Sequence, residues 1–238
     1  MNEKKFAIVV SLIFALICAF GTPRQMHAQD GKTPYPSMAA LDQYLMTDRQ
    51  AEIALARSAA PESISRDAKI LVLGRHGYET AVEGKNGFVC VVERAWMSPF
   101  DSMEFWNPKI RSPLCFNPQA VRSILPITYK RTEIALAGQS KAQIIEWTKA
   151  AYAQKELPAL EPGAMCYMMS KAAYLTDDDG HNLAHLMFYT PPMDGANWGA
   201  DLPGSPVLLG QQGPPEPFTL FIVPVGRWSD GTSAPLPR

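Results

Sequence analysis

The densest group of potential metal ligands in the sequence is the run Asp177-Asp178-Asp179-Gly180-His181-Asn182-Leu183-Ala184-His185. His181 and His185 are four residues apart, a separation that brings both to one side of either a helix or a strand. Together with a carboxylate from Asp178 or Asp179, they could bind one divalent metal ion. Such an ion would activate water, so the run supports the hypothesis of a metal-dependent hydrolase.

Two specific metal motifs fail on this run. A zinc-protease helix needs glutamate directly after the first histidine, and Asn182 stands there. A calcium loop with Gly180 as its sixth residue would begin at Leu175 and end at Leu186, where carboxylates are required. We therefore favour a solvated turn with hydrogen-bonded histidines, and keep the hydrolase as the alternative. For His76, a turn residue is favoured over a distant metal ligand.

A second candidate site is aromatic. Trp96, Phe105 and Trp106 lie in a proline-rich segment, 96–126, which is too irregular for a long helix or a central strand. Such rings often anchor a long loop to the core. They also suit stacking on sugars or apolar molecules, because flat rings offer contact area at little entropic cost. We predict a non-enzymatic binding module whose groove is lined by these three residues and Trp198, for an unknown small molecule, glycan or protein and without a cofactor.

Three cysteines follow residue 28. Cys90 is expected in a strand and Cys115 in a proline-rich loop, and they form the favoured disulfide pair. Closing that loop would contribute roughly 3 kcal/mol. The alternative is three buried thiols that pack as small hydrophobes. Cys166, flanked by methionines and a tyrosine, is predicted to be a buried free thiol rather than a nucleophile.

The N-terminus has the layout of a signal peptide. Lys4 and Lys5 precede an apolar run, 6–20, and small and polar residues follow up to position 28. The run is shorter than the roughly 18 residues that a stable membrane-spanning helix needs, so we expect no membrane span after cleavage. The mature protein is predicted to be periplasmic or extracellular.

The remaining chain, 29–238, has the size of one domain, and no linker or repeat divides it. Residues 1–28 hold three of the 22 basic and one of the 23 acidic residues, so without them the net charge is −3. This balance argues against nucleic-acid binding, which needs concentrated Lys and Arg. The sequence also lacks a serine-hydrolase elbow, a phosphate-binding P-loop and a dinucleotide fingerprint.

The expected elements describe an α+β fold with a mainly antiparallel sheet and two or three helices. Ser37 and a Thr47–Gln50 capping box predict a helix that ends at Pro61, and a Ser140–Gln143 capping box predicts one that ends before Pro158. Asn86-Gly87 predicts a hairpin between two of the strands. The expected strands are 70–73, 78–82, 88–92, 165–169, 186–189, 207–209 and 218–223.

Four phrases of this chain resemble those of a group of uncharacterised secreted bacterial proteins. They are Asn86-Gly87-Phe88-Val89-Cys90, Ala164-Met165-Cys166-Tyr167-Met168-Met169-Ser170, Ala184-His185-Leu186-Met187 and Trp198-Gly199-Ala200-Asp201-Leu202-Pro203-Gly204-Ser205-Pro206-Val207. The resemblance covers most of the mature chain. It implies an exported bacterial protein and supplies no activity and no catalytic residue.

Overall fold

The frame of the protein is a single eight-stranded sheet, seen in a computed structural model that describes residues 34–177 and 183–236. The strands are β1 Lys69–Gly74, β2 Gly77–Val82, β3 Val89–Glu93, β4 Ser112–Phe116, β5 Met165–Met168, β6 His185–Thr190, β7 Leu208–Gln212 and β8 Thr219–Pro224. Their order across the sheet is β2-β1-β3-β4-β5-β6-β8-β7. Neighbouring strands are antiparallel except β1 and β3, which are parallel.

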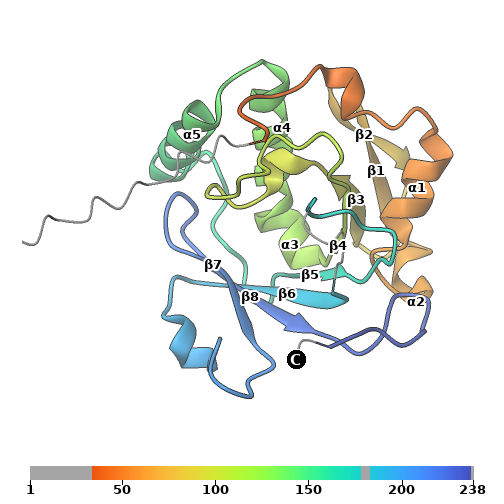
Figure 1. Cartoon of the computed structure of the whole chain (residues 1–238), viewed down its shortest axis with the longest axis vertical. Helices are drawn as coiled ribbons and strands as arrows, with labels where there is room; N and C mark the ends of the chain where they lie inside the picture. Colours follow the sequence, from red (N-terminus) through yellow and green to blue (C-terminus); the bar gives the residue numbers. More distant parts are fainter. Residues whose placement is uncertain (1–33, 178–182, 237–238) are drawn as a thin grey trace, which may run out of the picture. The chain divides into compact units, whose positions relative to one another are not determined.

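Helices cover both faces of the first half of this sheet. The α-helices are α1 Arg49–Arg57, α2 Glu62–Ser65, α3 Pro118–Ser123, α4 Leu125–Leu136 and α5 Lys141–Ala153. Short 3-10 helices span Leu41–Gln43, Ala95–Met97 and Gly195–Trp198. Figure 1 shows α1 and α4 on opposite sides of strands β1 and β3. The sheet therefore separates two layers of core.

The two layers use alternate residues of the same strands, because successive side chains of a strand point to opposite faces. Ile70, Cys90 and Val92 pack in a cluster with α1. Val89 and Val91 pack on the other face, in a cluster that includes residues of α3 and α4. Glu93 is two residues after Val91 on β3, so its side chain points to the same face as those of Val89 and Val91. It therefore faces the α4 layer, where it is 7% exposed.

The predicted α+β class and the mainly antiparallel sheet are confirmed, and all seven expected strands are present. The described residues, 34–177 and 183–236, all belong to one compact unit. Strand β4 was not expected, since Pro113 suggested a loop. A proline is tolerated in β4 because β4 pairs with β5 only over Cys115 and Phe116. Pro113 lies outside this pairing, so its missing N–H removes no hydrogen bond to β5.

The predicted hairpin between the second and third strands is wrong. Strand β2 returns along β1 through the two-residue turn Arg75-His76, and β3 pairs with the other edge of β1. Gly87 does adopt the left-handed conformation, at φ 78°. The side chain of Asn86 forms hydrogen bonds with the backbone of Ile64 and Phe88. The turn therefore forms as expected, but the two strands that it connects, β2 and β3, are not neighbours in the sheet.

The structure has more helices than the two or three predicted, with five α-helices in the described residues. Helices α3 and α4 fall where prolines suggested irregular chain or where no element was expected. Pro118 and Pro126 occupy the first turns of these helices, where a missing N–H costs nothing because it would have no helical partner. Prolines here begin helices instead of breaking them.

The first predicted helix is shorter than expected. Ser37 does not cap a helix, and the chain forms only a 3-10 turn at Leu41–Gln43. Helix α1 is capped by Asp48, whose side chain accepts hydrogen bonds from the backbone N–H groups of Gln50 and Ala51. The capping box of Ser140 and Gln143 at the start of α5 is confirmed.

The Cys90–Cys115 disulfide is confirmed, and it joins directly opposed residues of β3 and β4. Cys115 therefore lies on a strand and not in the predicted loop. Cys166 is a buried free thiol, as expected. In the part of the chain that the structure describes, no helix combines the length and the apolar character needed to cross a membrane.

Candidate functional site

A cavity of about 300 Å³ lies between helix α4 and the face of the sheet that α4 covers. Its wall is mainly apolar and includes Leu114, Phe116, Ile127, Met168, Met187 and Ile222. Pro99, which is exposed, also lines it, together with the half-buried Met97 and Ser98. The cavity thus approaches solvent at the segment 97–99.

Besides His185, four polar residues of the wall are almost completely buried, and they come from three parts of the chain. Glu93 ends β3, Thr128 and Arg131 are one turn apart on α4, and Glu216 lies in the loop between β7 and β8. The Thr128 hydroxyl donates to Glu93 at 2.5 Å. Arg131 Nη1 forms an ion pair with Glu216 at 3.2 Å. We call these four residues the polar end of the cavity.

Arg131 is the centre of this polar end. Its Nη2 donates to the carbonyl oxygen of Ser98 at 2.9 Å, and its guanidinium lies over the ring of Phe100 at 4.1 Å from the centroid. Its Nε has no hydrogen-bond partner in the described structure, although the side chain is only 2% exposed. A buried guanidinium with an unsatisfied N–H is unfavourable unless another acceptor reaches it.

Glu93 is poised to exchange a proton near neutral pH. Burial raises the pKa of its carboxyl to about 7, opposed by the Thr128 hydrogen bond and by the charge of Arg131. The negative charge of Glu216 favours the protonated form further. Near pH 7 the carboxyl therefore divides between a protonated hydrogen-bond donor and an ionised acceptor.

His185 lines the same cavity from β6, at a distance from the polar end. Strand register places Val91, Leu114, Met168 and His185 in one row across four strands. Glu93 lies two residues further along β3. Three strand spacings across the sheet and this offset along the strand place its backbone roughly 16 Å from that of His185. These two residues cannot act as an acid–base pair in direct contact.

The ring of His185 is held by the backbone two residues before it. Nδ1 lies 2.5 Å from the carbonyl oxygen of Leu183, and burial lowers the pKa of the imidazole. The neutral ring therefore donates from Nδ1 and leaves Nε2 as an acceptor. The other predicted metal ligands, Asp178, Asp179 and His181, lie outside the described residues.

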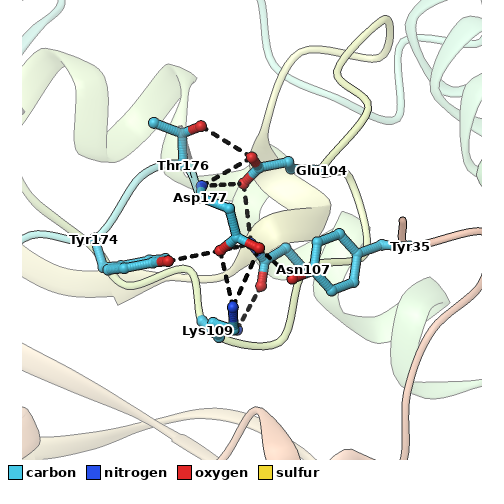
Figure 2. Close-up of polar contacts among 7 residues, drawn as sticks. All are labelled: Tyr35, Glu104, Asn107, Lys109, Tyr174, Thr176 and Asp177. Carbon is cyan, nitrogen blue, oxygen red and sulfur yellow. Dashed lines mark hydrogen bonds and ion pairs between the residues drawn. The ribbon is translucent and has the colours of Figure 1, made fainter. Parts of the chain in front are cut away.

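The carboxylate of Asp177, the first of the three aspartates, is bound by side chains of the protein (Figure 2). Its carboxylate accepts hydrogen bonds from Tyr174 at 2.6 Å, Tyr35 at 2.5 Å and Asn107 at 3.0 Å, and pairs with Lys109 at 3.1 Å. The hydrogen bonds from Tyr174 and Tyr35 hold the pKa of this carboxyl well below its usual range. Both oxygens are used, which fits a structural role.

Glu104 completes this partly exposed cluster, as Figure 2 shows. It accepts from the backbone N–H of Asp177 at 2.8 Å, from the Thr176 hydroxyl at 2.9 Å and from Asn107 at 2.9 Å. The cluster fastens the segment 174–177 to the loop 104–109. We call it the Asp177 latch.

The described residues give little support to a metal site. Across 34–177 and 183–236, no three His, Cys, Asp or Glu side chains are arranged to hold a metal ion. His76 is exposed in the turn between β1 and β2 and does not line the cavity. The metal hypothesis would therefore depend on residues that the structure does not describe.

The four aromatic candidates do not form one groove. Trp96, Phe105 and Trp106 share a buried cluster, in which the indole of Trp96 donates to Thr132 at 2.9 Å. Trp198 is 41% exposed and stacks on Phe221, with ring centroids 4.4 Å apart. Phe105 and Trp106 also line a second, larger cavity of about 730 Å³, between the segment 35–41 and the turn before α5.

We take the smaller cavity as the candidate site because its wall contains buried ionisable groups. None of Glu93, Arg131 and Glu216 was predicted as a site residue. Two signals were present in the sequence: Glu93 follows Val89 and Val91 in strict alternation, and Arg131 falls on the helical spacing between Ile127 and Ala135. Neither signal says that the residues meet.

The arrangement can hold an apolar molecule and bind one polar group at the end where Glu93 and Arg131 lie. Cys166 contributes no nucleophile, because burial raises the pKa of its thiol and outweighs the opposing hydrogen bond from Tyr189. Comparisons of the chain with protein-family models, with curated proteins and with solved structures found no match.

Proposed function

We propose that this protein is an exported binding module that holds a small, mainly apolar molecule in the cavity between α4 and the sheet. The observation that carries the proposal is the combination of an apolar wall with a few buried polar groups at one end. Small-molecule sites commonly have this composition, in which apolar contacts supply affinity and a few polar groups supply orientation.

The size of the cavity limits the ligand. A cavity of about 150 Å³ in another protein accommodates benzene, so the 300 Å³ here suits a molecule of about ten non-hydrogen atoms. A ligand of this size would contact Leu114 and Met187 from the sheet and Ile127 from α4. The Asp177 latch and Trp198 contribute no wall to this cavity.

Export is supported by the disulfide and by the signal-like N-terminus. Disulfides persist mainly in oxidising compartments, and Cys90–Cys115 is fully buried in the sheet. N-terminal sequencing of protein recovered from the periplasm or the medium should show a start close to residue 29. Intact protein that begins at Met1 and accumulates in the cytosol would contradict export.

Binding is tested by thermal-shift screening of apolar compounds of this size. The wild type should show a saturable rise in melting temperature with at least one compound class. Leu114→Phe, which fills the cavity, should abolish the rise, and Met187→Phe provides a second cavity-filling variant should the first fail to fold. Leu202→Phe is the matched control, because Leu202 is 54% exposed and does not line the cavity.

The outcomes separate the hypotheses. A rise that persists equally in the cavity-filling variants and the control would show that compounds bind elsewhere and would refute the proposal. Elemental analysis of protein purified without chelator belongs to the same experiment. Stoichiometric metal that is lost in His185→Ala would instead favour the metal-dependent hydrolase.

A further inference from the structure

The polar end of the cavity has one buried donor that the protein does not use. Arg131 donates from Nη1 to Glu216 and from Nη2 to the Ser98 carbonyl, and its Nε has no partner. Among the described residues only one other buried side-chain nitrogen or oxygen, Nε of Arg57, lacks a partner, and Arg57 does not line this cavity. An unsatisfied donor in the wall of a binding site indicates where a ligand atom bonds.

Arg94 is a second buried arginine, and it does not line the cavity. Arg94, fully buried, donates from Nε to the Tyr44 carbonyl at 2.8 Å, from Nη1 to the Val92 carbonyl, and from Nη2 to Glu52 at 2.8 Å. Every nitrogen of this guanidinium has a protein acceptor. The guanidinium of Arg94, which does not line the cavity, is thus fully satisfied, whereas that of Arg131 is not.

The acceptors at the polar end are largely occupied. Glu216 accepts from Arg131 through Oε1 and from Gln211 through Oε2, at 2.6 Å. Glu93 accepts from Thr128 through Oε1. A ligand group that only donates would compete with these bonds, whereas a group that accepts would find the unused N–H of Arg131.

The charges at this end disfavour an ionic ligand group. Arg131 is already paired with Glu216, and burial raises the pKa of Glu93 to about 7, so below this pH the polar end is close to neutral. A carboxylate brought into the cavity would add an unpaired negative charge next to Glu216 and would lose its hydration. A neutral carbonyl oxygen carries neither cost.

Resting on the proposed function, we infer that the ligand is a neutral molecule with an apolar body and one carbonyl oxygen, as in a ketone, ester or amide, and that this oxygen accepts a hydrogen bond from Nε of Arg131. A protonated Glu93 provides a second donor at the same end. The apolar body occupies the part of the cavity lined by Leu114, Ile127 and Met187.

Four molecules that each join a phenyl ring to one branched substituent, with the same number of non-hydrogen atoms, test this inference at pH 6. They are acetophenone, with a carbonyl; benzoate, with a carboxylate; 1-phenylethylamine, with an ammonium; and isopropylbenzene, with no polar group. Calorimetric titration of the disulfide-bonded protein should show acetophenone binding about tenfold tighter than isopropylbenzene. This ratio corresponds to one hydrogen bond from a charged donor.

The matched variant is Arg131→Lys, which keeps a positive charge beside Glu216 but removes Nε. It should lower the affinity for acetophenone to that for isopropylbenzene and leave the latter unchanged. Should this variant fail to fold, the double variant Arg131→Met/Glu216→Leu removes the buried pair together and makes the same prediction. Glu52→Gln is the control at the other buried pair and should retain the preference.

Each result has one meaning. Equal affinity for all four molecules in the wild type would keep the binding function but overturn the carbonyl inference. Tightest binding of benzoate or of the amine would overturn it in favour of an ionic ligand. Failure of all four to bind, isopropylbenzene included, would overturn the proposed function itself.

Discussion

Replacing Glu93 by glutamine should change how the stability of the protein depends on pH. Below pH 4.5 the carboxyl is protonated in both the folded and the unfolded chain. Between pH 4.5 and about 7 the unfolded chain releases this proton while the folded protein retains it, because burial raises the pKa of Glu93. Wild-type stability should therefore fall as the pH rises through this window and level off above it.

The size of the effect follows from the two pKa values. A difference between 4.5 and about 7 corresponds to about 3 kcal/mol in the free energy of unfolding, at about 1.4 kcal/mol per pH unit. Glu93→Gln keeps the size of the side chain and can still accept from Thr128, but it does not titrate. Its stability relative to the wild type should rise by about 3 kcal/mol between pH 4.5 and pH 8.

The assay is guanidinium unfolding of both proteins, with the disulfide intact, at several pH values. The difference between the two curves cancels the titration of other groups. Thr128→Val gives a second arm, since loss of its hydrogen bond to Glu93 should raise the pKa of the carboxyl further and extend the decline to higher pH. Parallel curves for the wild type and Glu93→Gln would refute the assignment of Glu93 as a buried, titrating group.

Three further perturbations test the structural account. Joint replacement of Cys90 and Cys115 by alanine should cost roughly 3 kcal/mol in urea unfolding, because the bridge closes a loop over a separation of 25 residues, and an unchanged midpoint would contradict this. Asp177→Asn should speed hydrogen exchange in the segment around Tyr35, which bonds to Asp177, without altering ligand affinity. Unchanged exchange would show that the Asp177 latch does not stabilise this segment. Arg131→Met should cost about 3–5 kcal/mol in guanidinium unfolding by leaving Glu216 unpaired, and adding Glu216→Leu should recover much of it; no recovery would argue against the pair.

Local signals predicted most of the strands and one helix correctly. Four consecutive apolar residues, 70–73, predict a strand that is buried on both faces, and β1 is such a strand. The Ser140–Gln143 pattern predicts the start of α5 because the capping box is formed by residues within one helical turn. Elements whose stability depends on such near neighbours can be recognised from sequence.

Strand pairing could not be predicted in the same way. Asn86-Gly87 is a good turn, yet β3 pairs with the far edge of β1 and with β4. The turn conformation is a local property, whereas the choice of partner depends on which apolar faces can be buried together. The Cys90–Cys115 pair was predicted correctly although the strand that carries Cys115 was not.

The sequence by itself determined the class of fold and most strands, because these follow from local patterns, and it favoured the Cys90–Cys115 pair over three free thiols without deciding between them. Only the tertiary structure decided the candidate site. The buried stripe of α4 carries Thr128, Arg131 and Thr132, which read as polar in the sequence and conceal the helical pattern. Glu216 is 85 residues from Arg131 along the chain, and only folding around the cavity excludes water from their ion pair and raises the pKa of Glu93.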